Sequence, residues 1–343
     1  MVTRVLAIAD DLTGALEVGA LFASAGMRSV VTTGAIGGLD DPVIVIDTET
    51  RHSEPGEAEA IVESRAAGWR SLVYKKTDST LRGNIGPELR ALYKLYGGPI
   101  AYVPAYPEMG RTVVDGSVFV DGVPLAATAF ARDSLNPVRD GRVRSLLGAD
   151  CDCVVFDGRN TNDVIQAAQE ILSSGAFRIV AGPGAIAGAL AACLGTPLII
   201  DWPPVRSCLV VNGSRHEVSQ RQIESALESL AICIDDGAPW QLLHREIPPA
   251  ADPIQVAAIT GIEVNRLLAE REFDGLLVFG GDTAFGILKS LGLPLLRPVG
   301  EILPGVPVSS IEGRREVLIT KAGAFGMPDL AGQLRSKLNG SDK

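Results

Sequence analysis

Short apolar runs alternate with longer segments of helical spacing along most of the chain, and this rhythm constrains the fold more than any other feature. Each run is rich in Val, Ile and Leu and ends in a polar or glycine-containing loop, as buried strands of parallel sheets do. In the first half, strands are expected at residues 5–9, 29–33, 43–47, 72–75, 100–103, 153–156, 178–181 and 198–200. Helices are expected at residues 13–25, 55–68, 87–96, 162–173 and 185–194. This alternation predicts an α/β fold.

A proline-rich break at residues 201–207 divides the chain. We place a domain boundary near residue 205, which predicts one domain over residues 1–205 and a second over residues 206–343, in keeping with a length of 343 residues. The second half repeats the rhythm, with strands expected at 208–211, 232–234, 276–279 and 317–320 and helices at 219–229, 252–271, 283–291 and from 329 onward. Each domain is therefore expected to hold a mostly parallel sheet flanked by helices.

One segment in the first domain departs from this pattern. Residues 111–125 contain two Asp-Gly pairs, Asp115-Gly116 and Asp121-Gly122, set between residues that favour strands. Asp-Gly between such residues is a strong signal for a tight hairpin turn. The segment predicts a β hairpin rather than a helix.

Charge and composition narrow the classes of partner. The chain has 31 Lys and Arg against 41 Asp and Glu, a net charge of −10, so neither nucleic acid nor an anionic membrane is expected as a partner. Apolar runs are broken by glycine and proline, and the N-terminus enters a predicted strand without a leader pattern, so we expect a cytoplasmic protein. Five dispersed cysteines predict free thiols rather than disulfides or structural zinc. A homo-oligomer is left open.

Polar residues gather where predicted strands of the first domain end. Asp10 and Asp11 follow the first strand and open the first helix. Ligands of open α/β sheets bind beyond the carboxyl ends of strands, and two carboxylates there suit substrate hydroxyls, a cation or a general base. The alternative is that Asp11 only caps the helix, which explains one carboxylate and not two.

A second loop of this kind follows the strand at 72–75. Lys76, Asp78, Ser79 and Arg82 lie in it, and Arg82 is suited to hold a carboxylate through two parallel hydrogen bonds. The strand at 100–103 leads into a third loop, which ends at the cation Arg111. The alternative for such loops is a solvated surface without function. Three strand-end loops of one domain are expected to share one cleft.

The second domain carries glycine-rich loops instead. Residues 212–216, 280–284 and 321–326 each follow a predicted strand, and glycines there let backbone N–H groups approach a phosphate. Neither the P-loop pattern G-x-x-x-x-G-K-[ST] nor the dinucleotide pattern G-x-G-x-x-G occurs, so a standard form of either site is not expected. Together these loops are typical of a nucleotide site, although each alone is more often plain strand-to-helix geometry.

At these loops the sequence resembles the four-carbon acid sugar kinase family, whose members act on threonate, erythronate and 3-oxo-tetronate. The run Asp78-Ser79-Thr80-Leu81-Arg82-Gly83-Asn84 is the most specific part of the resemblance, which extends over nearly the whole chain. The other matching segments are residues 10–15, 104–112, 280–283 and 321–326, with Asp133 and Asn136-Pro137.

The resemblance implies a sugar-acid-binding N-terminal domain, an ATP-binding C-terminal domain, and transfer of the γ-phosphoryl group of ATP to a hydroxyl of the acid with the help of Mg²⁺. It places the substrate on Asp10, Asp11 and Arg82. It places ATP on Ser214, Gly280, Gly281, Asp282, Thr283 and Gly323. Lys76, Asp78, Ser79 and Arg111 complete the expected substrate site, and the base is left open among Asp10, Asp11 and Asp78.

The chain departs from the family pattern mainly in the second domain. Phe285, Ala322, Ala324 and the pair Arg215-His216 stand where similar members have other, mostly small residues, and the chain is short for the family. These departures leave the choice of nucleotide and of sugar acid open. Two alternative functions remain: an aldolase or dehydratase that uses Lys76 as a Schiff base or a carboxylate-bound metal, and a sugar-acid sensor without catalysis.

Overall fold

The computed structural model describes residues 3–133, 136–148, 151–234, 237–243, 252–322 and 326–339. By their contacts the residues group into two compact units, Met1–Leu198 and Ile199–Lys343, which we call the N-terminal and C-terminal units. The domain boundary expected near residue 205 stays a prediction. Among the described residues, no helix combines the length and the apolar character needed to cross a membrane.

The N-terminal unit is built on a seven-stranded, all-parallel sheet in the order β2-β3-β1-β4-β10-β5-β9. Its strands are β1 (Val5–Ala9), β2 (Ser29–Thr32), β3 (Val43–Asp47), β4 (Leu72–Lys76), β5 (Ile100–Tyr102), β9 (Cys153–Val155) and β10 (Ile179–Gly182). The central strands β1, β3 and β4 are buried throughout, which explains their continuous apolar sequence. The predicted fold class is confirmed here.

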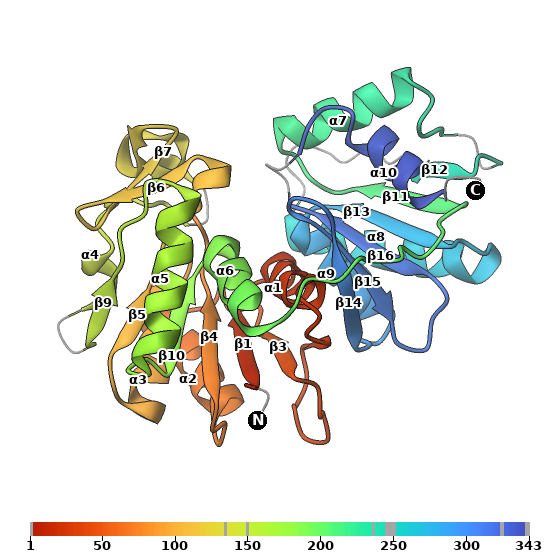
Figure 1. Ribbon diagram of the computed structural model, residues 1–343. Helices are drawn as coiled ribbons and strands as arrows, with labels where there is room; N and C mark the ends of the chain where they lie inside the picture. The colour runs from red at the N-terminus through yellow and green to blue at the C-terminus, as the bar shows by residue number, and fades with distance from the viewer. Residues whose placement is uncertain are drawn as a thin grey trace. The chain divides into compact units, whose positions relative to one another are not determined.

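Helices cover both faces of this sheet (Figure 1). The helices α1 (Leu12–Ser24), α5 (Thr161–Ser174) and α6 (Gly184–Leu194) pack against one another on one face, and α2 (Pro55–Ala66) and α3 (Ile85–Tyr96) pack together on the other. The short α4 (Arg144–Leu147) lies against α3. Because all strands are parallel, the loops that follow β1, β3, β4 and β5 emerge at one edge of the sheet.

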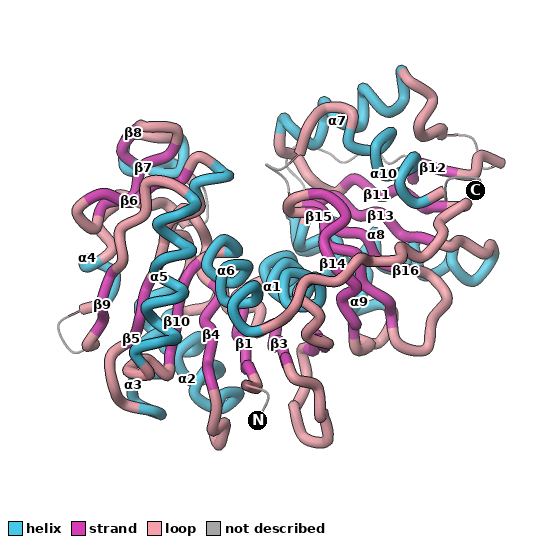
Figure 2. Tube along the Cα trace, in the orientation of Figure 1, coloured by secondary structure: helices cyan, strands magenta, loops and turns pink. Residues whose placement is uncertain are grey.

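The predicted β excursion is confirmed. The strands β6 (Arg111–Val114), β7 (Ser117–Val120) and β8 (Val123–Pro124) form a separate antiparallel sheet beyond the carboxyl end of β5, shown in magenta in Figure 2. Asp115 and Gly116 have φ values of 49° and 68°, as a tight turn with two left-handed residues requires. Short 3₁₀ helices at Pro107–Met109, Leu125–Ala127 and Ala129–Arg132 flank this sheet.

The C-terminal unit holds a mixed sheet in the order β12-β11-β13-β16-β15-β14. Its first four strands are parallel, whereas β15 and β14 are antiparallel to their neighbours. The strands are β11 (Cys208–Asn212), β12 (Trp240–Leu243), β13 (Gly275–Phe279), β14 (Leu296–Leu303), β15 (Val306–Ile311) and β16 (Val317–Lys321). The helices α8 (Pro253–Glu270) and α9 (Gly281–Ser290) pack together, as do α7 (Glu217–Glu228) and α10 (Leu330–Leu338).

Two strand predictions are wrong. Residues 198–200 form no strand: Leu198 is 61% exposed and Ile199 is fully exposed, so their apolar side chains are not part of a buried sheet. Residues 232–234 contribute only an isolated bridge from Cys233 to Gln241, and the strand beside β11 is β12. The sequence analysis missed β14 and β15. The burial of β14 alternates along the strand, but Pro298 and Gly300 occupy two of its buried positions, so its sequence lacks the apolar alternation of a strand. All five cysteines are free, as predicted.

Candidate functional site

Arg51 links the two carboxylates that follow β1. Its Nε and Nη2 lie 2.8 and 2.9 Å from the two Oδ atoms of Asp10, and its Nη1 lies 2.6 Å from Asp11 Oδ2. The strand order β3-β1 makes this possible, because Arg51 lies in the loop after β3 and both carboxylates lie in the loop after β1. Burial opposes the charge of Arg51, but Asp10 and Asp11 outweigh it and hold the Arg51 pKa well above its usual value.

Asp11 has a second role in the local structure. Its side chain caps α1 by accepting hydrogen bonds from the Gly14 N–H at 2.9 Å and the Thr13 hydroxyl at 2.7 Å. The alternative of helix capping is therefore true of Asp11, but it leaves Oδ2 in contact with Arg51. Burial raises the Asp11 pKa, but the nearby Arg51 and Lys76 cations outweigh burial, so that the net shift of the pKa is downward.

A second acidic pair, Asp47 and Glu49, lies at the end of β3 and in the loop after it. Glu49, with a φ of 50°, accepts a hydrogen bond from the Leu12 N–H at 3.0 Å, and Asp47 accepts one from the Glu49 N–H at 3.2 Å. Burial, together with the negative charges of Glu49 and Asp11, holds the Asp47 pKa well above its usual value. The loop after β3 thus carries acidic groups as well as the cation Arg51.

Asp78 and Arg82 form a second linked pair, in the loop after β4. Asp78 Oδ2 lies 2.8 Å from Arg82 Nη2, and Asp78 Oδ1 accepts hydrogen bonds from the Thr80 N–H at 2.9 Å and from the Thr80 hydroxyl at 2.5 Å. Arg82 Nη1 also lies 3.4 Å from Asp133, and the guanidinium carbon lies 5.5 Å from the centre of the Phe130 ring. Burial raises the Asp78 pKa, but Arg82 outweighs it and holds the pKa far below its usual range.

Lys76 is held from the other side by α1. Its Nζ lies 3.3 Å from Glu17 Oε2, and the Tyr106 hydroxyl donates to Glu17 Oε1 at 3.0 Å. Burial lowers the Lys76 pKa, but Glu17 and the carboxylates after β1 outweigh it and raise the pKa above its usual value. A lysine that forms a Schiff base needs a lowered pKa, so this environment disfavours the aldolase alternative.

A buried ion pair between Lys75 and Glu88 lies next to the loop that carries Arg51. Lys75 Nζ lies 3.0 Å from Glu88 Oε2, and both side chains are almost fully buried. Glu88 also accepts a 2.5 Å hydrogen bond from the Thr50 hydroxyl, and Asn84 donates to the Thr50 carbonyl at 2.8 Å. These contacts fix the backbone next to Arg51 from beneath.

Ser79 and Arg111 complete the predicted substrate residues. Ser79 is half-buried in the turn after Asp78. Arg111 begins β6 and donates to the Met109 carbonyl. Burial lowers the Arg111 pKa, and the carboxylates of Asp121 and Asp78 oppose this shift without cancelling it.

The structure brings most of the predicted residues of the N-terminal unit together. Asp10 and Asp11 are linked through Arg51, Asp78 is linked to Arg82, and Asp78 acts on the Arg51 pKa. The sequence analysis missed Arg51 and the acidic residues beside it. The signal was present, since Arg51 follows the strand Val43–Asp47 in a polar loop, as the other site residues follow their strands.

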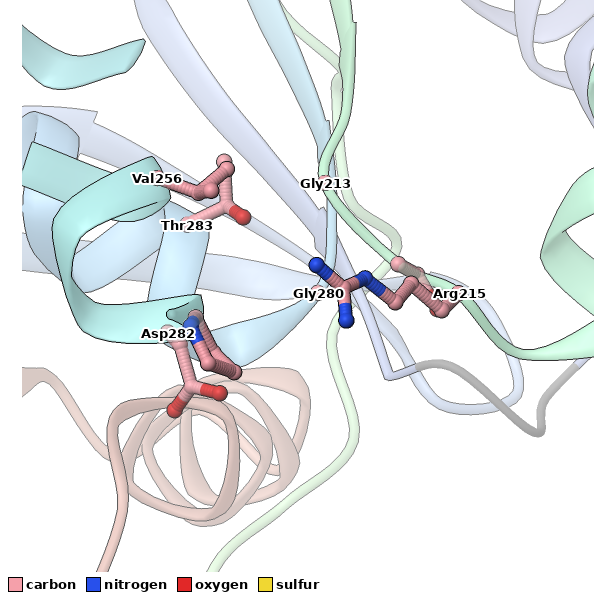
Figure 3. A pocket seen from close by; sticks show the side chains of 8 residues that line it. Gly213, Arg215, Val256, Gly280, Asp282 and Thr283 are labelled. Carbon is pink, nitrogen blue, oxygen red and sulfur yellow. The ribbon is translucent and has the colours of Figure 1, made fainter. Parts of the chain in front are cut away.

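The C-terminal unit carries a pocket of about 240 Å³ at the ends of β11 and β13 (Figure 3). It contains four of the six residues expected to bind ATP. The lining residues are Gly213, Ser214, Arg215, Pro253, Val256, Gly280, Asp282 and Thr283. Gly281, which is also expected there, begins α9 between two of them. Gly323 lies outside the described residues.

Glycines let the two loops of the pocket meet. A Cβ on Gly213 would lie only 1.8 Å from Thr283 Oγ1, so no larger residue fits without moving the start of α9. Gly280 has a φ of 107° and precedes α9 without a side-chain cap. The first N–H groups of α9 are thus available to an anion in the pocket.

The departures noted in the sequence fall at different places. Arg215 lines the pocket, whereas Phe285 and Ala322 are not among its described lining residues and Ala324 lies outside the described part of the chain.

Lys321, at the end of β16, is fully buried, and its Nζ lies 3.0 Å from Ser219 Oγ. Burial lowers the Lys321 pKa to about 8.

Comparisons with known proteins match a sugar-binding domain in the N-terminal part of the chain and a nucleotide-binding domain in the C-terminal part. The model of a sugar-binding N-terminal domain matches residues 5–152, and that of a nucleotide-binding C-terminal domain matches residues 244–331. A D-threonate kinase of Cupriavidus necator is 31% identical, over 94% of each chain. A 3-oxo-tetronate kinase of Methylobacterium radiotolerans is 26% identical, over 95% of this chain and 97% of its own. The alignment with the first spans 400 positions, more than the 343 residues here, so that relative carries residues without a counterpart.

Solved structures share the fold over nearly the full length. A Salmonella typhimurium protein described as a putative tRNA synthase superposes with a TM-score of 0.79 at 22% identity, over 98% of this chain and 99% of its own. A Bordetella bronchiseptica domain of unknown function, solved with bound citrate as a domain-swapped dimer, has a TM-score of 0.51 at 27% identity, over 98% of both chains. With the matching motifs and the full-length similarity to the threonate kinase, these findings show that the chain belongs to the four-carbon acid sugar kinase family.

Proposed function

We propose that this protein transfers the γ-phosphoryl group of ATP to a hydroxyl of a four-carbon sugar acid. The observation that carries the proposal is the separation of two chemistries. The N-terminal unit gathers cations and carboxylates suited to a small hydroxy acid, and the C-terminal unit has a pocket at an uncapped helix N-terminus suited to phosphates. Relatives named as threonate, erythronate and 3-oxo-tetronate kinases support the same assignment.

We assign the roles in the N-terminal unit by exposure. The side chain of Arg82 is 30% exposed and that of Asp11 is 20% exposed, whereas that of Asp10 is only 2% exposed. Arg82, still held by Asp78, binds the substrate carboxylate, and Asp11 accepts the proton of the attacking hydroxyl. Asp10 acts indirectly, by holding Arg51 in place. The strongly lowered pKa of Asp78 makes it a weak base, so its role is to orient Arg82.

The bonds and the proton of the transfer are accounted for by ATP, the acid and Asp11. The hydroxyl oxygen bonds to the γ-phosphorus, the bond from that phosphorus to the β-phosphate oxygen breaks, ADP leaves, and the hydroxyl proton passes to Asp11. Asp282 and the Thr283 hydroxyl supply the hard oxygen donors that Mg²⁺ prefers, and both line the pocket. When bound, Mg²⁺ neutralises charge on the phosphates.

The test is an ATP-consumption assay with Mg²⁺ over D-threonate, D-erythronate and other four-carbon acids, with mass spectrometry of the product. We expect a phosphorylated acid from at least one of them and none from six-carbon acids. Asp11→Asn is expected to lower kcat by about 10²–10⁴-fold, the scale of a lost general base. If the acids and ATP both bind but no ADP forms, the kinase assignment is wrong and a sensor remains.

A further inference from the structure

Two of the described residues that line the C-terminal pocket are charged. Of its described lining residues, Arg215 alone carries a positive charge and Asp282 alone carries a negative one. The buried cation Lys321 lies at the end of the neighbouring strand β16 and is not part of that lining. Arg215 is therefore the cation that the described pocket offers to a ligand.

A triphosphate needs more positive charge than the helix supplies. The N-terminus of a helix acts as roughly half of an elementary charge, and the chain has no P-loop lysine. Without Mg²⁺, an anion at the start of α9 is also repelled by the Asp282 carboxylate, which lines the same pocket. A guanidinium offers several N–H donors to phosphate oxygens and keeps its charge at any physiological pH.

The loop that carries Arg215 is held on both sides. The Ser214 N–H donates to Asn212 Oδ1 at 3.1 Å, and Gln220 Nε2 donates to the Ser214 carbonyl at 2.8 Å. After Arg215, the His216 side chain caps α7 by accepting from the Val218 N–H at 3.2 Å. In Figure 3 the guanidinium extends from this loop toward Gly280, where β13 ends.

We propose that Arg215 binds the phosphate chain of the nucleotide, and so gives this site its preference for nucleoside di- and triphosphates over nucleosides. The inference rests on the proposed nucleotide site and adds a residue that departs from the family pattern. Arg215 contributes through charge and hydrogen bonds to phosphate, and does not read the base.

The test compares Arg215→Ala and Arg215→Lys with Arg221→Ala. Arg221 is a suitable control because it is an exposed arginine one turn into α7, paired with Glu217, and lies outside the described pocket lining. Calorimetric titrations would use ATP, ADP and adenosine at low and high salt. Arg215→Ala is expected to lower the affinity for ATP by about 10- to 100-fold and to flatten its salt dependence, while the affinity for adenosine stays the same. Arg215→Lys should recover part of the loss, and Arg221→Ala should bind like the wild type.

Three results would overturn the inference, and they differ from one another. Unchanged ATP affinity in folded Arg215→Ala refutes the phosphate contact while leaving the nucleotide site intact. An equal loss for adenosine and ATP shows that Arg215 contacts the base or supports the fold. No ATP binding by the wild type overturns the proposed function as well.

Discussion

Arg51 shows how one residue can organise a charged site. Its guanidinium contacts both oxygens of Asp10 and one of Asp11, at distances of 2.6–2.9 Å. Paired geometry of this kind stabilises a guanidinium that is mostly buried, and each partner would be costly to leave alone. Arg82 is similarly engaged by Asp78 and Asp133 but is more exposed, which suits it to meet a ligand.

We expect Arg51→Ala to destabilise the protein by roughly 3–5 kcal/mol, because it leaves the Asp10 carboxylate buried without its partner. Arg51→Lys retains a charge but loses the two parallel hydrogen bonds, so it should recover only part of the stability and of the sugar-acid affinity. Urea unfolding of both variants measures the stability, and calorimetric titration with a four-carbon sugar acid measures the affinity. The pair of Arg266 with Glu270, in which both side chains are exposed, provides a control, since Arg266→Ala should change stability by about 1 kcal/mol or less. Wild-type stability in Arg51→Ala would show that the pair is not a structural support.

At the level of elements, the loops after β11 and β13 depend on close contact. Gly213 lies in the loop after β11 and Thr283 in the first turn of α9, and no side-chain atom fits between them. The start of α9, and with it the N–H groups that face the pocket, is therefore positioned by a contact that only glycine allows.

Gly213→Ala should push α9 away from β11. We expect an overpacking cost of about 1–3 kcal/mol in unfolding experiments and a loss of ATP affinity, while sugar-acid affinity stays unchanged. Gly56→Ala is the matched control, because Gly56 lies in α2, where an added Cβ would have nothing within 4 Å, and should tolerate alanine. Equal ATP affinity in Gly213→Ala and the wild type would place the phosphates elsewhere.

At the scale of the whole molecule, the chain forms two compact units, each with its own set of strands and its own buried core. Each unit carries one of the two candidate ligand sites. The chemistry of each site is built from residues of that unit alone, so each ligand should bind without the other.

A four-carbon sugar acid should therefore raise the melting temperature without nucleotide, and Mg-ATP should do so without the acid. A ligand at 100 times its dissociation constant adds about 2.7 kcal/mol to the state that binds it. Differential scanning fluorimetry with each ligand alone measures this. If neither acid nor nucleotide shifts the transition unless both are present, the sites are not independent as described.

Much of the fold could be predicted because it rests on local patterns. Buried runs such as Val5–Ala9 and Val43–Asp47 indicate strands by their composition, and the Asp115-Gly116 pair predicted the hairpin turn. The antiparallel pair β14 and β15 was missed because Pro298 and Gly300 interrupt its pattern. The strand expected at the exposed Leu198 and Ile199 was wrong because an apolar run in sequence says nothing of whether another element covers it.

The sequence by itself determined that polar loops follow buried parallel strands, and hence that Asp10, Asp11, Asp78 and Arg82 belong to one edge of a sheet. Only the tertiary structure decided how those charges pair. Arg51 lies 41 residues from Asp10, and Arg82 lies 51 residues from Asp133. Such pairs depend on the strand order β3-β1-β4 and on the path of the chain after β5, which no local pattern encodes. Periodicity is a property of neighbouring residues, whereas a charged contact is a property of the folded chain.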